Sequence, residues 1–362
     1  MARATTIALR RGWTTGTCAA AAAHAAFTAM LTGRFPDPAS IRLTRAGMTS
    51  FPLALAELSE VSARAGVIKD AGDDPDVTHG ALVIAETAWA PSGSGIGFAA
   101  GEGVGTVTRP GLPLAVGEPA INPAPRAMIR DTLLHVAAEN GAPLPDVTVT
   151  ISIPGGERLA AKTMNARLGI VGGLSILGTT GVVIPYSCAC WIHAIHRGID
   201  VARAAGLDHI ATATGATSER AVQRLYSLPD HALIDMGDFA GATLKYLRRH
   251  PVAQVTIAGG FAKLAKLASG NLDLHSARSR VDIPALARML AELGAEPSIA
   301  QAAQAAAGAG EILALAGDWR ELLARAVAAQ AREVALATLC GKTAVEVAIV
   351  DRQGSFLARV GG

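Results

Sequence analysis

The chain has 362 residues, and at about 150 residues per domain this length predicts two domains, or three. Hydrophobic residues make up 50% of the sequence and charged residues 17%, which excludes wholesale disorder and allows a large core. The net charge of +2, from 32 Lys and Arg against 30 Asp and Glu, gives no overall field for nucleic acid or an anionic membrane. A local basic pocket for a small acidic molecule is compatible with this balance.

Four cysteines are too few for a disulfide framework in a chain of this length. Cys188 and Cys190 lack a second Cys or His pair at zinc spacing, so we expect no metal site and predict reduced, mostly buried thiols in a cytoplasmic protein. The basic N-terminus and the alanine run after it resemble a signal peptide superficially. Because Gly16-Thr17 precedes the run and His24 interrupts it, we expect no targeting signal.

Residues 168–192 carry no charge over a length that could span a bilayer. Glycines, Pro185 and a Thr-Thr pair divide this segment into short apolar pieces. We therefore expect buried strands and tight loops here, and no membrane association.

The first region, residues 1–186, is rich in Gly and Pro and predicts an α+β domain. Thr14-Thr15-Gly16-Thr17 has the pattern of a helix start, which predicts an Ala-rich helix through about Leu31. A second helix is expected over residues 124–140. Short apolar runs predict strands over residues 40–43, 67–69, 81–87, 103–108 and 147–153.

The second region, residues 187–362, repeats a strand, a glycine turn and a helix three times after a first helix over residues 194–205. This rhythm predicts a Rossmann-like, doubly wound parallel sheet with ligands at the carboxyl ends of its strands. A helical C-terminal segment is expected over residues 283–339, and a last strand over residues 344–350. The repeated strands are predicted over residues 209–214, 232–236 and 255–258. Their helices are predicted over 218–226, from after Phe239 to about His250, and over 261–269.

Polar residues and glycines follow each of the three repeated strands. Backbone N–H groups at a helix start suit a phosphate, a carboxylate or a ribose, and an acid at a strand end accepts hydrogen bonds from ribose hydroxyls. Each position also fits an ordinary cap or turn, but their recurrence predicts a nucleoside-type ligand. Neither a G-x-G-x-x-G nor a P-loop motif follows these strands, which disfavours a dinucleotide or a P-loop nucleotidase. The candidate cofactor-binding residues are Gly215, Ser218, Glu219, Asp235, Asp238, Gly259 and Gly260.

An acidic segment, KDAGDDPD at residues 69–76, precedes His79 in the first region. It lacks the spacing of an EF-hand, so turn-forming aspartates are the leading interpretation and contact with a substrate is the second. Histidine titrates near neutral pH, which makes His79 a candidate acid or base beside an ordinary structural role. Cations in the Gly/Pro loops suit a substrate rich in carboxylates, and the candidates are Lys69, Arg109, Arg126, Lys162 and Arg167.

Five loop segments, taken in order, resemble the CbiD family of cobalt-precorrin-5B C(1)-methyltransferases in anaerobic cobalamin biosynthesis. They are GWTTGTCAAAA at 12–22, KDAGDDPDVTHG at 69–80, GEGVGTVTRPGL at 101–112, GEPAINP at 117–123 and NARLGIVGGLSILGTTG at 165–181, followed by VVIPYS at 182–187.

The resemblance implies methyl transfer from S-adenosylmethionine to carbon 1 of cobalt-precorrin-5B, giving cobalt-precorrin-6A. It also implies that cobalt arrives with the substrate. The different rhythm of the two regions predicts that the first domain binds the corrin and the second binds the cofactor. Asp73 and His79 are nominated as general bases. Polar residues of the matching segments complete the substrate-binding candidates: Thr14, Thr15, Thr17, Asp70, Asp74, Asn122, Asn165, Thr179 and Thr180.

Two alternatives remain open from the sequence. One is an NAD(P)-dependent corrin reductase in the same pathway, and the other is a tetrapyrrole carrier without catalytic activity. The first should bind NADPH, and the second should bind product without turnover. A homo-oligomer is compatible with each of these functions.

Overall fold

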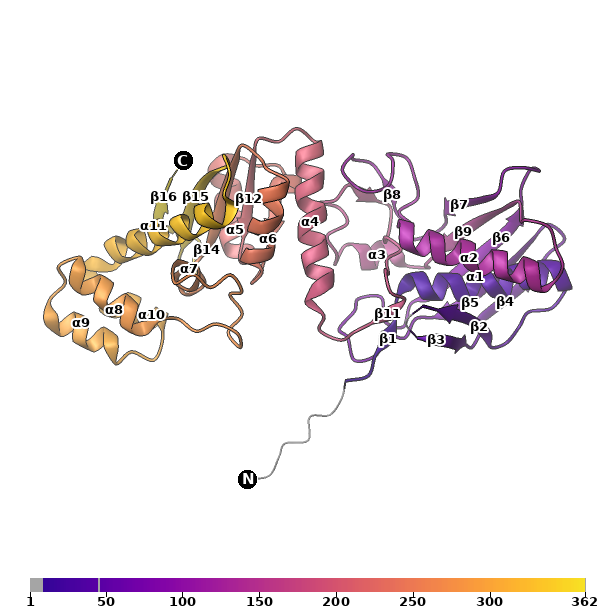
Figure 1. The fold of residues 1–362 in the computed structure, drawn as a ribbon, viewed down its shortest axis with the longest axis horizontal. Coiled ribbons are helices and arrows are strands. Elements are labelled where there is room, and N and C mark those ends of the chain that lie inside the picture. The colour runs from indigo at the N-terminus through magenta and orange to yellow at the C-terminus, as the bar shows by residue number, and fades with distance from the viewer. Residues whose placement is uncertain (1–8, 45, 362) are drawn as a thin grey trace, which may run out of the picture. The chain divides into compact units, whose positions relative to one another are not determined.

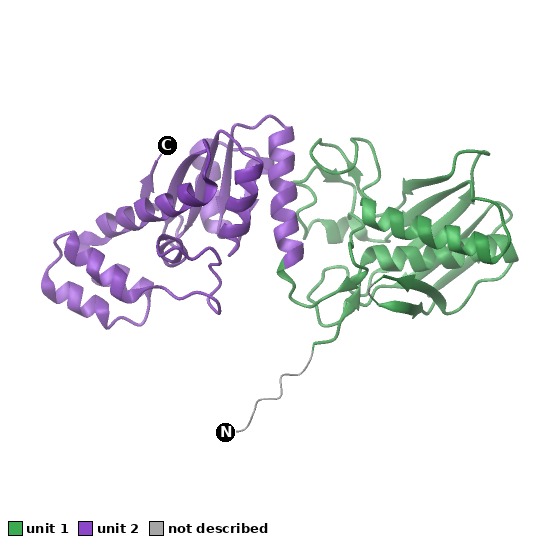
Figure 2. Cartoon of the chain, in the orientation of Figure 1, with its two compact units in different colours: residues 1–188 green, residues 189–362 purple. Residues whose placement is uncertain are grey.

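The computed structural model describes residues 9–44 and 46–361 (Figure 1). The basic N-terminal residues 1–8 of the segment considered for targeting lie outside the described part. The chain divides into two compact units, a first that ends at Cys188 and a second that begins at Ala189 (Figure 2). The predicted boundary follows Tyr186. Both units are mixtures of helices and sheets, so the protein is a mixed α/β protein with several sheets.

The first unit contains a five-stranded sheet in the order β4-β5-β6-β9-β7. Neighbours from β4 to β9 are antiparallel, and β7 lies parallel to β9. The strands are β4 (Leu55–Leu58), β5 (Ser62–Ile68), β6 (Leu82–Trp89), β7 (Ile96–Ala100) and β9 (Val147–Ser152).

Helix α1 (Thr15–Thr32) packs against β5, β6 and helix α2 (Pro123–Glu139), so it is covered on several sides. Ala19, Ala20, Ala21 and Ala22 are each 0% exposed. Alanine has the highest helix propensity and a small side chain, which lets this helix lie close to both the sheet and α2. Thr14 is the N-cap, and its hydroxyl accepts a hydrogen bond from the Thr17 backbone N–H at 3.2 Å. The predicted helix start is confirmed.

Short antiparallel pairs and one short helix join the loops of the first unit. β1 pairs with β11, β2 with β3, and β8 with β10. The elements are β1 (Gly12–Trp13), β2 (Ala39–Leu43), β3 (Gly47–Phe51), β8 (Thr106–Val107), α3 (Gly156–Ala160), β10 (Ile170–Val171) and β11 (Val182–Val183).

The second unit contains a five-stranded sheet in the order β13-β12-β14-β15-β16. The first four strands are parallel, and β16 is antiparallel to β15. The strands are β12 (His209–Ala213), β13 (Leu233–Asp235), β14 (Gln254–Gly260), β15 (Ala344–Val350) and β16 (Phe356–Val360).

Helices cover this sheet through two separate apolar clusters. The larger cluster joins Ile210 of β12 to α4, α6, α7 and α11, while the smaller joins the next residue, Ala211, to Val222 of α5. Since successive strand residues point to opposite faces, α5 lies on the face opposite the other helices. The helices are α4 (Cys188–Ala204), α5 (Ala216–Tyr226), α6 (Ala240–Arg249), α7 (Phe261–Ala268), α8 (Ile283–Glu292), α9 (Pro297–Gln304), α10 (Ala309–Leu315) and α11 (Arg320–Leu339), with 3₁₀ turns at Asp230–Ala232 and Gly317–Trp319.

Besides two-residue strands such as β1, four longer strands were not predicted: β3, β4, β7 and β16. Each is mostly exposed or half-buried, so its sequence lacks the alternation of buried and exposed residues that marks a strand. The strand predicted over residues 103–108 is wrong except at β8, because Gly103 takes a left-handed conformation with φ of 71°.

The apolar run at residues 168–192 forms β10, β11, loops and the start of α4. Its side chains are only partly buried, since Val171, Leu177 and Ile184 are exposed. Within residues 9–44 and 46–361, no helix combines the length and apolar character that crossing a membrane requires.

Candidate active site

Lys263 joins the three strand-end loops that the sequence singles out in the second unit. Its ammonium donates a hydrogen bond to the Thr214 carbonyl, after β12, at 2.9 Å. The same ammonium pairs with Asp238 Oδ1, in the loop after β13, at 3.1 Å. Lys263 itself lies in the first turn of α7, directly after β14. It was missed from the sequence because a lysine in an Ala/Leu/Lys helix has the pattern of a solvated face.

A cavity of about 700 Å³ opens at the carboxyl end of this sheet; we call it the edge cavity. The first turns of α5 and α7 line one part, α10 and the start of α11 a second, and the segment after β15 a third. Ligand pockets for small molecules have volumes of about 300–1,000 Å³. The edge cavity therefore has room for a nucleoside-sized ligand.

Three predicted cofactor-binding residues, Gly215, Ser218 and Gly260, line the edge cavity. Gly215 is the N-cap of α5 and provides no side-chain cap, while the Ser218 hydroxyl donates to the Gly215 carbonyl at 2.8 Å. A Cβ added at Gly260 would meet no atom within 4 Å, so this glycine leaves open space toward the cavity.

The other predicted cofactor residues lie beside the cavity and do not line it. A Cβ at Gly259 would come within 2.8 Å of Thr214 Oγ1, so this glycine is required by strand packing. Glu219 is 7% exposed in the first turn of α5. Asp235 accepts the Gly237 N–H at 3.3 Å, a turn contact, and Asp238 is held by Lys263.

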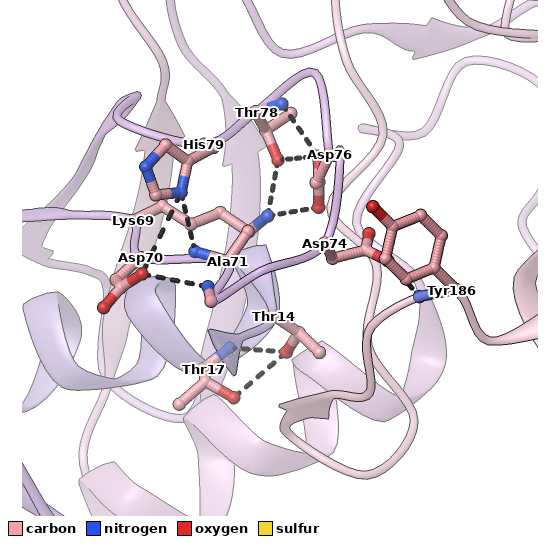
Figure 3. Close-up of polar contacts among 11 residues, drawn as sticks. Thr14, Thr17, Lys69, Asp70, Ala71, Asp74, Asp76, Thr78, His79 and Tyr186 are labelled. Atoms are coloured by element: carbon pink, nitrogen blue, oxygen red, sulfur yellow. Dashed lines mark hydrogen bonds and ion pairs between the residues drawn. The ribbon is translucent and has the colours of Figure 1, made fainter. Parts of the chain in front are cut away.

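In the first unit, residues 69–80 form the acidic loop, whose polar contacts are drawn in Figure 3. Lys69 is only 1% exposed, and its ammonium donates to the Thr78 hydroxyl at 2.6 Å and pairs with Asp76. Burial raises the pKa of Asp76, but Lys69 and the Thr78 hydrogen bonds outweigh it, and the net pKa is lowered. Lys69 is therefore a buried cation that is paired within the loop, and its contact with the substrate stays a prediction.

The other aspartates of the acidic loop also bind chain atoms. Asp70 pairs with Arg10 and accepts the Gly72 N–H; these contacts, with the Arg10 hydrogen bond the largest, lower its pKa to about 2. Asp73 Oδ2 accepts the Arg10 backbone N–H at 2.6 Å. Asp74 accepts the Tyr186 backbone N–H at 2.8 Å, which links two loops far apart in sequence. These bonds favour the interpretation of turn-forming aspartates.

His79 presents a defined ring nitrogen to solvent. Its Nδ1 accepts the Ala71 backbone N–H at 3.1 Å, so the neutral ring carries its proton on Nε2. The side chain is 52% exposed. His79 can therefore donate a hydrogen bond through Nε2–H. Its lone pair for accepting a proton is on Nδ1, and the Ala71 N–H already occupies it.

Most hydroxyl and amide candidates of the first unit are committed to internal bonds. Thr17 is 0% exposed and donates to the Gly181 carbonyl at 2.7 Å. Asn165 is 6% exposed, with its amide donating to the Gly173 carbonyl at 3.1 Å. Both side chains are therefore used inside the fold, and direct substrate contact by Thr17 and Asn165 stays a prediction. Thr14 caps α1, Thr15 is buried in the first turn of α1, Thr180 bonds the Val182 carbonyl, and Arg167 contacts other parts of the chain. Asn122 is the N-cap of α2, but its side chain makes no cap hydrogen bond.

Among the predicted cations, Arg126 and Arg109 differ in whether their guanidinium groups have hydrogen-bond partners. Arg126 donates to the carbonyls of Ile121 and Pro119 and pairs with Glu118. Arg109 lies against Gly169, and its buried NH1 has no hydrogen-bond partner among the described residues. An unpaired guanidinium nitrogen is suited to an external carboxylate. Lys162 and Thr179 are exposed.

The glycine-rich segments of the first unit pack against one another. A Cβ at Gly103 would lie 2.0 Å from the Ile153 carbonyl oxygen, and one at Gly173 would lie 2.3 Å from Gly103. A Cβ at Gly12 would lie 2.0 Å from the Ala71 carbonyl carbon. These glycines permit backbone crossings that assemble the loops, rather than close approach of a ligand.

Within the described ranges, no group of three or more His, Cys, Asp or Glu side chains is arranged to hold a metal ion. Of the four free thiols, only Cys18 is buried, where burial raises its pKa to about 12. The prediction of mostly buried thiols is wrong, since Cys190 and Cys340 are exposed.

Comparison with known proteins identifies the family. Residues 2–185 match the CbiD family model, and residues 273–361 match the model of the CbiD C-terminal domain. This chain belongs to the CbiD family. The membership predicted from five loop segments is confirmed.

Two named relatives extend the match over almost the whole chain. A cobalt-precorrin-5B C(1)-methyltransferase of Brucella anthropi is 57% identical over 353 residues, covering 97% of this chain and 96% of the relative. One of Paramagnetospirillum magneticum is 57% identical over 351 residues, covering 97% and 98%. A crystal structure of a CbiD cobalamin biosynthesis protein from Archaeoglobus fulgidus is 30% identical, with a TM-score of 0.39 over 75% of this chain and 83% of that one.

Proposed function

We propose that this chain transfers a methyl group from S-adenosylmethionine to carbon 1 of cobalt-precorrin-5B, giving cobalt-precorrin-6A, in the cytoplasm. The observation that carries this proposal is 57% identity to methyltransferases of that name over 97% of the chain. Cobalt is part of the substrate, so the enzyme needs no metal site of its own.

The edge cavity is the proposed site of the methyl donor. The order β13-β12-β14 places the strands that follow β12 on its two sides. In doubly wound sheets, ligands bind beyond the carboxyl ends at such a reversal of strand order. Gly215, after β12, and Gly260, the last residue of β14, both line the cavity, which supports a Rossmann-like use of this sheet.

The first unit is the proposed binding region for the corrin, whose periphery carries carboxylates. Arg109 offers a buried guanidinium nitrogen that no described residue satisfies, and Lys162 is exposed. His79 offers an N–H donor at Nε2. Arginine, lysine and a neutral histidine donor all suit carboxylate recognition.

Methyl transfer depends more on the alignment of donor and acceptor than on a reactive side chain. The donor's S–CH₃ bond breaks as a bond forms between the methyl carbon and carbon 1 of the macrocycle, and S-adenosylhomocysteine leaves with the electron pair of the broken bond. Holding donor and acceptor in line supplies much of the rate enhancement, and fixed dipoles supply more. Asp73 and His79 are the candidates for moving a proton on the macrocycle.

Calorimetric titration with S-adenosylhomocysteine tests the donor site. Gly260→Val fills open space in the edge cavity, whereas Gly308→Val fills open space outside it, and both positions have ordinary backbone conformations. We expect binding in the micromolar range, about −8 kcal/mol, to be lost in Gly260→Val and kept in Gly308→Val. Equal binding in both variants would move the donor site elsewhere. Binding of NADPH in place of S-adenosylhomocysteine would favour a reductase.

A further inference from the structure

The rim of the edge cavity carries charged side chains that are not used by the fold. Arg320, the first residue of α11, and Arg352, in the turn between β15 and β16, both line the cavity. Both are exposed, and neither makes a hydrogen bond or ion pair with any described residue. Arginine is the side chain best suited to bind a carboxylate through two parallel hydrogen bonds.

The turn that carries Arg352 is fixed by Asp351. Its Oδ1 accepts the backbone N–H groups of Gln353 at 2.9 Å and Ser355 at 2.8 Å. The turn lies against the first turn of α5, since a Cβ on Gly354 would lie 3.5 Å from Thr217 Cγ2. Arg352 is therefore held at a defined place beside the cavity wall formed by α5.

Asp351 also lines the cavity, and its Oδ2 makes no hydrogen bond with the described part of the chain. We call Arg320, Arg352 and Asp351 the rim residues. They combine two guanidinium groups that make no bond to the described chain with one carboxylate of which only Oδ1 accepts hydrogen bonds. A site built for phosphate alone gains nothing from a nearby carboxylate, because like charges repel. A ligand end that carries a carboxylate and an ammonium group together, such as an amino acid, satisfies both kinds of rim group.

We propose that Arg320 and Arg352 bind the carboxylate of the methyl donor's amino-acid tail, and that Asp351 binds its ammonium group. This inference rests on the proposed donor site and adds the residues that recognise the tail. The nucleoside part then lies beside Gly215 and Gly260, which line the same cavity. The three rim residues are specificity determinants that distinguish an aminoacyl-nucleoside from a nucleotide.

Calorimetry with three probes tests this: S-adenosylhomocysteine, 5′-methylthioadenosine, which lacks the amino-acid tail, and ADP, which carries phosphates instead. A charge-assisted hydrogen bond corresponds to about tenfold to 100-fold in affinity. We expect Arg352→Gln and Arg320→Gln each to weaken S-adenosylhomocysteine by that factor and to leave 5′-methylthioadenosine within about twofold. Asp351→Asn should weaken S-adenosylhomocysteine selectively as well, and Arg352→Lys should recover part of the affinity.

Arg325→Gln is the matched control, because Arg325 is an exposed residue of α11 that does not line the cavity. Far-UV circular dichroism confirms that each variant is folded. Unchanged affinity for S-adenosylhomocysteine in the two arginine variants overturns the inference while leaving the donor site in place. Equal losses for both nucleosides, or tighter binding of ADP than of S-adenosylhomocysteine, also overturn it. If the wild-type chain binds neither nucleoside, the proposed donor site fails together with the inference.

Discussion

Single residues of the acidic loop act mainly on the chain itself. Asp70 and Asp73 hold Arg10, Asp74 holds Tyr186, and Asp76 holds Lys69. Each carboxylate that binds a backbone N–H or a cation fixes the position of a second segment. His79 is then left as the exposed donor of a rigid loop. These contacts within the chain hold the acidic loop in place.

The tautomer of His79 leads to a test of its role. His79→Gln keeps an amide oxygen that can accept the Ala71 N–H and an NH₂ group that can donate outward, whereas His79→Ala keeps neither. If His79 binds the substrate as a hydrogen-bond donor, His79→Gln should keep kcat/KM within about tenfold of wild type. His79→Ala should lower kcat/KM by more than that, through a higher KM. If His79 is the general base, both variants should lose kcat alike.

The ion pair of the buried Lys69 and the half-buried Asp76 predicts a loss of stability when the cation is removed. Lys69→Met leaves Asp76 without its cation, and we expect about 3 kcal/mol of destabilisation in urea unfolding. Arg64→Met is the control, because Arg64 on β5 and Glu57 on β4 form an ion pair with both side chains exposed, where a loss of about 0–1 kcal/mol is expected.

The same pair predicts a pH dependence. The pKa of Asp76 is lowered in the folded chain, so the pair contributes stability above the unfolded pKa of about 3.9 and loses it as pH falls through the folded pKa. The difference between wild type and Lys69→Met should therefore shrink below about pH 4. A difference that stays constant down to pH 3 would contradict the assigned role of Asp76.

At the scale of elements, glycines decide how loops of the first unit cross. Gly103 and Gly93 both take left-handed conformations, with φ of 71° and 82°. A Cβ would meet the Ile153 carbonyl oxygen at 2.0 Å in the first case and no atom within 4 Å in the second. A side chain at either position therefore has the same cost of a left-handed backbone conformation. Only at Gly103 would its Cβ also collide with another part of the backbone.

This comparison gives an element-scale prediction. Gly93→Ala should lower stability by about 1 kcal/mol, the usual cost of a left-handed non-glycine residue. Gly103→Ala should lower it by more than about 3 kcal/mol, because backbone must move to admit the methyl group. Thermal and urea unfolding of both variants measure the difference, and similar losses at the two positions would refute the close-approach interpretation.

At the scale of the whole molecule, each unit has its own core. The buried apolar clusters of the first unit involve no residue beyond Ile176, and those of the second begin at Ile195. Since hydrophobic burial is the main stabilising term, each unit should unfold as a cooperative body.

We therefore expect two calorimetric transitions for the full chain. Gly103→Ala should lower the midpoint of one, and saturating S-adenosylhomocysteine should raise that of the other by mass action. The free thiol of Cys18, buried in the first unit, should become reactive only in the transition that Gly103→Ala shifts. A single transition shifted by both changes would show that the units unfold together.

The sequence by itself determined the family, most helices and strands, and the three strand-end loops of the second unit. These depend on local signals, such as the Thr14 cap, the alanine run and the glycines after short apolar strands, which act within a few residues. The sequence did not predict the mostly exposed strands β3, β4, β7 and β16. Their residues do not alternate between buried and exposed positions.

Only the tertiary structure decided which polar groups are already satisfied. Lys69 and Asn165 have the composition of ligand-binding residues but bond to the chain, whereas Arg320 and Arg352 have the pattern of surface charges but line a cavity. Partners such as Asp74 and Tyr186, or Lys263 and Asp238, are brought together by the packing of separate elements. Whether a polar side chain finds its hydrogen-bond partner within the chain depends on which distant elements pack beside it. The residue type alone does not encode this packing.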